Sequence, residues 1–187
     1  MEYIIPAVIF GLILLIVVWG IAIYNKLVYN RNLVKEGWSG IETQLKRRSN
    51  LIPNLVEAVK SYMGHEKGVL EKVTEARSRT GQASTPAERG KMEGMLGQAL
   101  ANVFAVAEGY PELKANENFM NLHNELSSME DEIQMARRYY NGTVRNFNVL
   151  IESFPSNVIA GMFTFVQAEY FEIEDEADRA VPKVNFS

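Results

Sequence analysis

Apolar residues recur at helical spacing along most of this chain. Between residues 34 and 62 they stand three or four positions apart, the heptad spacing of coiled-coil helices, and Arg48 occupies one position of that seam. A second heptad runs from about Glu117 to Phe154 and contains one extra four-residue step. No segment shows sustained alternation of apolar and polar residues, so the pattern predicts an all-α protein. The first seam comprises Val34, Trp38, Ile41, Leu45, Ile52, Leu55, Val59 and Tyr62.

The N-terminal stretch has a different pattern, because it is apolar without interruption. No charged residue occurs from Tyr3 to Tyr24, and a helix of that length extends for roughly 33 Å, enough to cross the hydrocarbon core of a bilayer. A cleaved signal peptide fits poorly, because Glu2 makes the start acidic and no small-x-small cleavage site follows Ile23. The sequence therefore predicts an uncleaved transmembrane anchor in residues 1–27.

The remaining chain predicts a helical body, residues 28–170, and an acidic tail, residues 171–187. With no helix-breaking signal between Tyr24 and Val34, the membrane helix is expected to continue to about Thr80, with a kink at Pro53. Thr85, Pro86 and Glu88 form a capping box that starts the next helix, which ends near Gly109. A short helix is expected from Val158 to about Phe165. We therefore expect an elongated antiparallel bundle of two long and two shorter helices, continuous with the anchor.

Charge predicts the orientation of the anchor. Lys26, Arg31 and Lys35 follow the apolar stretch, so the positive-inside rule places the body in the cytoplasm. These membrane-proximal cations also suit anionic lipid headgroups, although a topology signal on a solvated helix explains them equally well. The absence of cysteine agrees with a reducing compartment.

Composition and motifs argue against several classes of function. Residues 61–187 carry twelve Lys or Arg against nineteen Asp or Glu, a balance of −7, which disfavours nucleic-acid binding. His65 and His123 lie on different predicted helices, neither in an HExxH pattern, and no glycine-rich phosphate loop occurs. We therefore expect no catalytic residues, no cofactor, no metal site and no small-molecule substrate.

Two polar features remain. In an antiparallel bundle, Arg48 would meet polar residues near the second seam and form a buried polar layer, whose role is either to fix helix register or to bind a partner. The tail carries a cluster of carboxylates that is either a solubilising end or a docking surface for a basic partner. The second-seam candidates are Glu130, Arg137, Asn141 and Asn148, and the tail candidates are Glu172, Glu174, Asp175, Glu176 and Asp178.

Several motifs in a fixed order resemble the LemA family over essentially the whole chain. They are YNKLV (24–28), EGWSGIETQLKRRSNLIPNLVEAVKSY (36–62), EARS (75–78), GYPELKAN (109–116), ARRYYNGTVRNFN (136–148), FPSNVIAGMF (154–163) and PKVNF (182–186). The resemblance implies a bacterial inner-membrane protein with its N-terminus outside and a cytoplasmic helical bundle. The family has no established enzymatic activity, and its members are discussed beside membrane metalloproteases of the HtpX type.

Two roles follow. The first is a self-associating membrane scaffold, a homo-oligomer whose heptad seams pack either within or between chains. The alternative is an adaptor or regulator of a membrane enzyme such as an HtpX-type metalloprotease, which docks through the bundle or the acidic tail.

Overall fold

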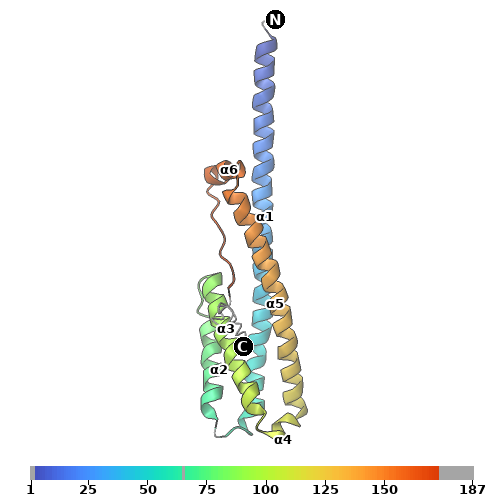
Figure 1. Cartoon of the computed structure of the whole chain (residues 1–187), viewed down its shortest axis with the longest axis vertical. Coiled ribbons are helices and arrows are strands. Elements are labelled where there is room, and N and C mark those ends of the chain that lie inside the picture. Colours follow the sequence, from blue (N-terminus) through green and yellow to red (C-terminus); the bar gives the residue numbers. More distant parts are fainter. Residues whose placement is uncertain (1–2, 65, 173–187) are drawn as a thin grey trace, which may run out of the picture. The chain divides into compact units, whose positions relative to one another are not determined.

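The computed structural model describes residues 3–64 and 66–172, and within them all regular structure is helical, as predicted (Figure 1). The two long helices are α1 (Ile4–Lys60) and α5 (Glu117–Glu152). The shorter ones are α2 (Lys67–Thr80), α3 (Pro86–Ala107), α4 (Pro111–Lys114) and α6 (Ser156–Met162).

The chain divides into two compact units, and α1 and α5 both contribute to each. Of the described residues, the first unit contains 3–39 and 138–168, and the second contains 40–64, 66–137 and 169–172. In the first unit Leu27 packs with Phe147, while Gly37 faces Tyr140, which is nearer the start of α5. An increasing number on α1 thus meets a decreasing number on α5, so the two helices run antiparallel there.

The second unit shows the same antiparallel order. Arg48 of α1 contacts Glu130 of α5, and Asn116, immediately before α5, donates a hydrogen bond to the Tyr62 hydroxyl beyond the end of α1. The core of this unit includes the buried side chains of Ile52, Leu55, Val59, Leu70, Val73, Leu96, Val103, Phe119 and Leu126.

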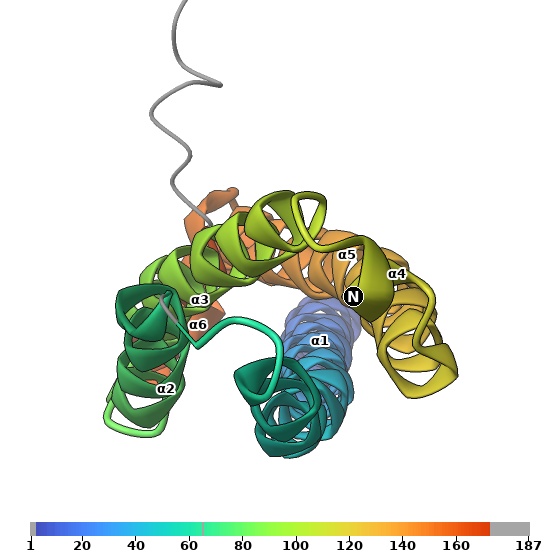
Figure 2. The same ribbon diagram turned by 90° about the horizontal axis from the view of Figure 1, so that it is seen from below.

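The expectation that the first helix continues to Thr80 is wrong. α1 ends at Lys60, and turn hydrogen bonds from the amides of Tyr62 and Met63 to the carbonyl of Val59 close it. α2 then packs beside α3 (Figure 2), so that Leu70 and Val73 enter the same core as the end of α1. A straight continuation would leave those apolar residues without that core.

The predicted capping box is present at the start of α3. The Thr85 hydroxyl accepts a hydrogen bond from the Glu88 amide at 3.2 Å, and Pro86 is the first helical residue. The Glu88 carboxylate accepts its bond from the Ser84 amide at 2.9 Å, one residue earlier than in the standard motif. The cap therefore satisfies two amides where the chain enters α3.

Candidate functional site

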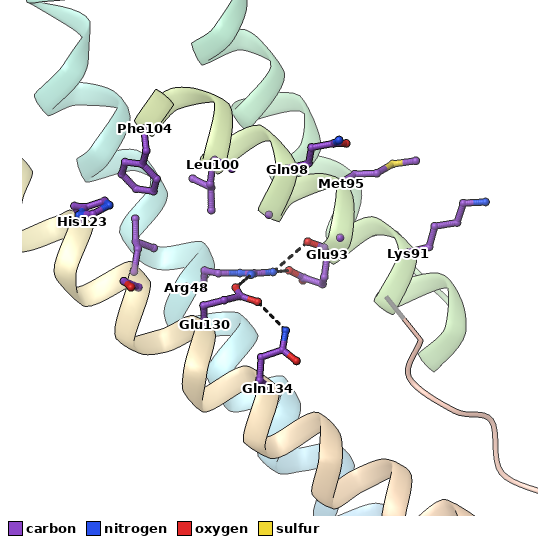
Figure 3. Close-up of a pocket in the computed structure, with 15 residues that line it drawn as sticks. Arg48, Lys91, Glu93, Met95, Gln98, Leu100, Phe104, His123, Glu130 and Gln134 are labelled. Atoms are coloured by element: carbon purple, nitrogen blue, oxygen red, sulfur yellow. Dashed lines mark hydrogen bonds and ion pairs between the residues drawn. The ribbon is translucent and has the colours of Figure 1, made fainter. Parts of the chain in front are cut away.

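A groove of about 820 Å³ opens in the second unit, with walls from α1, α3 and α5 (Figure 3). Apolar side chains on its walls include Met95, Leu100, Phe104 and Leu126, and α3 also contributes the small residues Gly94, Gly97 and Ala101. Arg48, Glu93 and Glu130 form a charged cluster in it.

Arg48 lies between two carboxylates (Figure 3). Its Nη2 atom donates to Glu93 Oε2 at 2.6 Å, and its Nη1 atom donates to Glu130 Oε2 at 2.6 Å. The Arg48 and Glu93 side chains are 3% and 1% exposed, whereas the Glu130 side chain is 44% exposed. The Arg48–Glu93 pair is thus removed from water, and Glu130 connects it to the solvent.

A second arginine completes the cluster. Arg89 lies one helical turn before Glu93, and its Nε atom is 3.0 Å from Glu93 Oε1, although the angle is not that of a hydrogen bond. An Nη atom of Arg89 donates to the carbonyl of Thr80 at 2.6 Å. Two arginines therefore face two glutamates, so the cluster has no net charge. Burial of Arg48 and Glu93 carries a desolvation cost, which their close pairing offsets.

The structure brings together only part of the predicted polar layer. Arg48 and Glu130 meet, whereas Asn148 belongs to the first unit, where its side-chain amide exchanges two hydrogen bonds of 2.9 Å with the main chain of Ala168. Arg137 and Asn141 are half-buried. Asn148 therefore holds the segment that follows α6 against α5.

Sequence reasoning missed Glu93 because the face of α3 that it predicted to be apolar overlaps only in part with the buried face. The apolar spacing along α3 predicts a core face of Met92, Met95, Leu96, Ala99, Val103 and Ala107. Leu96, Val103 and Ala107 are indeed buried, whereas Met95 is 47% exposed. The buried face is Gly90, Glu93, Leu96, Leu100, Val103 and Ala107. These positions also follow helical spacing, so Glu93 is a charged residue on an otherwise apolar helix face. That position was the available indication that Glu93 pairs with a buried cation such as Arg48.

The membrane-proximal cations lie in the first unit. Lys26 and Lys35 are exposed, and the Arg31 guanidinium lies 5.1 Å from the centre of the Phe165 ring. One helix of the described residues, α1, is long and apolar enough to cross a membrane, and its most apolar 18-residue window is 0% buried.

Of the predicted tail residues only Glu172 is described, and it is exposed. Its main chain passes so close to Gly90 that a Cβ atom there would lie 2.9 Å from the Glu172 carbonyl carbon. Phe171, just before it, is fully buried. Glu174, Asp175, Glu176 and Asp178 lie outside the described residues. Among the described residues, no three His, Asp or Glu side chains are grouped so that they could hold a metal ion.

Comparison with known proteins gives one family. The sequence profile of the LemA family matches residues 37–186. Magnetosome protein MamQ 2 of Paramagnetospirillum magneticum is 25% identical over 184 residues, which cover 84% of this chain and 68% of the relative. Protein LemA of Metamycoplasma hominis is 27% identical over 155 residues, 81% of this chain and 69% of the relative. Magnetosome protein MamQ of Magnetospirillum gryphiswaldense is 22% identical over 184 residues, with the same coverage as the first.

Proposed function

This chain belongs to the LemA family, and we propose that it is a non-enzymatic adaptor, anchored in the bacterial inner membrane, whose cytoplasmic body binds another protein in the groove between α1, α3 and α5. The open groove is the observation that carries this proposal. The names of the relatives do not assign one role, because two are named for the magnetosome and one is not.

The exposed apolar window of α1 supports the anchor. Its side chains would face water on every side in a soluble protein, whereas lipid is the solvent in which they are stable. Exposed Lys26 and Lys35 beyond it support a cytoplasmic body by the positive-inside rule.

Burial of the first heptad seam within a single chain favours an adaptor over self-association. Ile41, Leu45, Ile52, Leu55 and Val59 are all at most 1% exposed within a single chain. From Ile41 to Val59 the apolar residues of the seam are therefore buried within the chain and are not available to a second copy. The strongest sequence argument for a coiled-coil oligomer therefore loses its basis, whereas the groove is an open surface of the second unit.

The chemistry of the groove indicates what would bind there. Met95 offers an adaptable apolar contact and Phe104 an aromatic one. Gly97 leaves space for close approach, since no atom lies within 4 Å of where its Cβ would be. The charged cluster is internally neutral, so it attracts neither acidic nor basic segments strongly. We therefore propose that the groove takes the apolar face of a helix from another membrane protein.

Self-association remains the second candidate, and one observation favours it. Large apolar side chains are exposed along α5, namely Met120, Met135, Tyr139 and Val149. These residues offer a second copy a contact that does not use the groove.

Photocrosslinking in cells tests the adaptor. A photoreactive amino acid replaces Gln98, an exposed residue of the groove, in the full chain, and adducts are identified by mass. We expect an adduct with an unlike protein that is lost when Gly97→Leu fills the groove. Gly40→Leu is the matched control, because Gly40 is also a helical glycine with open space around it but lies outside the groove.

The other outcomes contradict the adaptor. Adducts only with the same chain favour self-association, and an adduct that persists in the Gly97→Leu variant places the contact outside the groove. Removal of residues 173–187 separates groove docking from tail docking, because only the latter should be abolished.

A further inference from the structure

The segment around α6 combines two properties that rarely coincide on a water-exposed surface. Residues 153–168 contain no charged side chain, and Glu152 and Glu169 bound them. Their large apolar side chains are nevertheless exposed: Phe154 is 82% exposed and Met162 70%, and the set also includes Val158, Phe163 and Val166.

This segment belongs to the first unit and packs against a defined stretch of α1. Cδ1 of Ile159 lies 3.8 Å from the position that a Cβ atom on Gly20 would take. The Tyr24 ring lies 4.7 Å from the Phe163 ring and 5.9 Å from the Phe165 ring, centre to centre. Leu27, Phe147 and Ala160 form the buried core of this contact. α6 is therefore level with residues 20–27 of α1, as Figure 1 also shows.

If α1 spans the bilayer, the place of a residue along α1 gives its depth in the bilayer. A hydrocarbon layer about 30 Å thick takes up about 20 residues of helix at 1.5 Å each. A span that begins at Ile4 thus reaches the far edge of the hydrocarbon near Ile23, between Gly20, which faces Ile159 of α6, and Tyr24, which contacts Phe163 just after α6. Gly20 lies inside that edge and Tyr24 at it.

The polar groups around the segment agree with this depth. Arg31, whose guanidinium lies over the Phe165 ring, stands two helical turns beyond Tyr24, where headgroup phosphates would lie. Gln167 donates a hydrogen bond to the Glu152 carboxylate at 2.6 Å, which ties the two ends of the segment together on the water side. The apolar loop is therefore closed by polar contacts at its base.

We propose that α6 and its flanking residues, Phe154 to Val166, form a second membrane contact, which inserts into the interface of the leaflet where the span ends. The inference rests on the proposed anchor, because the depth of α6 is set by the span. The occupant is lipid rather than protein, because at this level a side chain that points away from α1 meets acyl chains and headgroups. With two contacts, the membrane fixes the rotation of the first unit about the axis of α1 as well as its position.

Spin labels on the full chain measure the depth directly. The chain has no native cysteine, so Met162→Cys, Leu14→Cys and Gly40→Cys each give one labelled site. Leu14 lies in the exposed apolar stretch, and Gly40 is exposed beyond it. The proteins are reconstituted in vesicles of phosphatidylethanolamine and phosphatidylglycerol, and collisions with oxygen and with a water-soluble nickel chelate are compared. We expect the Met162 label to lose collisions with nickel and keep those with oxygen, as the Leu14 label does, while the Gly40 label collides freely with nickel.

Each other result has a distinct meaning. Nickel access at Met162 with none at Leu14 overturns the second contact and keeps the anchor, whereas nickel access at Leu14 overturns the anchor itself. A Met162 label shielded from both reagents lies against protein, which also overturns the lipid contact. Val166→Cys repeats the measurement on the other flank in case the Met162 variant does not fold.

Discussion

Removal of the Arg48 side chain tests the buried charge cluster most sharply. Arg48→Met keeps the length and apolar stem of the side chain and deletes its charge. The Glu93 carboxylate, 1% exposed, then retains only the poorly aligned Arg89 contact at 3.0 Å. Loss of one partner of a buried ion pair costs about 3–5 kcal/mol in comparable cases, so we expect a decrease of that size in the free energy of unfolding.

Two further variants separate burial from charge. Glu130→Gln removes a partner that is 44% exposed, so water replaces much of what is lost and the expected cost is about 0.2–1 kcal/mol. The double variant Arg48→Met with Glu93→Met removes both buried charges. It should recover most of the stability, because well-packed apolar pairs replace buried ion pairs at little or no cost.

Urea unfolding of the full chain in mild detergent, followed by helical circular dichroism, measures all three variants. We expect the free energy of unfolding of Arg48→Met to be far below that of wild type, and that of Glu130→Gln to be slightly below that of wild type. The double variant should be much more stable than Arg48→Met and close to wild type. An Arg48→Met protein within a few tenths of a kcal/mol of wild type would refute the burial of this pair. A double variant as unstable as the single one would show that packing, not charge, explains the loss.

Three other substitutions test close packing and capping, two by the same unfolding assay and one by hydrogen exchange. Gly37→Leu should lower the free energy of unfolding by about 1–3 kcal/mol, because a Cβ atom there would lie 3.2 Å from the Tyr140 Cα atom. The control Gly40→Leu, at a helical position with open space, should be neutral or stabilising. Equal effects of the two variants would contradict the close approach of α1 and α5. Gly90→Ala should displace the Glu172 main chain and speed hydrogen exchange in residues 169–172, and unchanged exchange would be evidence against that contact. Thr85→Ala should cost about 1 kcal/mol through loss of the cap on α3, and no cost would mean that the bond to Glu88 does not contribute.

Local rules were sufficient for much of the fold. Uninterrupted apolarity identified the candidate span, heptad spacing identified α1 and α5, and the Thr85 capping box gave the start of α3 to the residue. The failure at α2 arose because Val69, Val73 and Ala76 keep the spacing of the preceding seam. Helical periodicity is the same whether a helix continues or turns back, so only the tertiary core distinguishes the two.

The candidate site was predicted only in part, for a similar reason. Arg48 and Glu130 stand out because each is a charged residue on or near an apolar seam. Glu93 was missed because the predicted apolar face of α3 did not include it, although that face shares Leu96, Val103 and Ala107 with the buried one. The bonds between Asn148 and Ala168 depend on where the chain returns after α6, which no local pattern specifies.

The most direct test of the adaptor is the composition of the complex that the protein forms in its own membrane. The full chain is crosslinked in cells, extracted in mild detergent, purified by an affinity tag and weighed intact by mass spectrometry, beside the Gly97→Leu variant. We expect a stoichiometric second protein that is absent from the variant. A species that contains only copies of this chain, equally abundant in both, would contradict it.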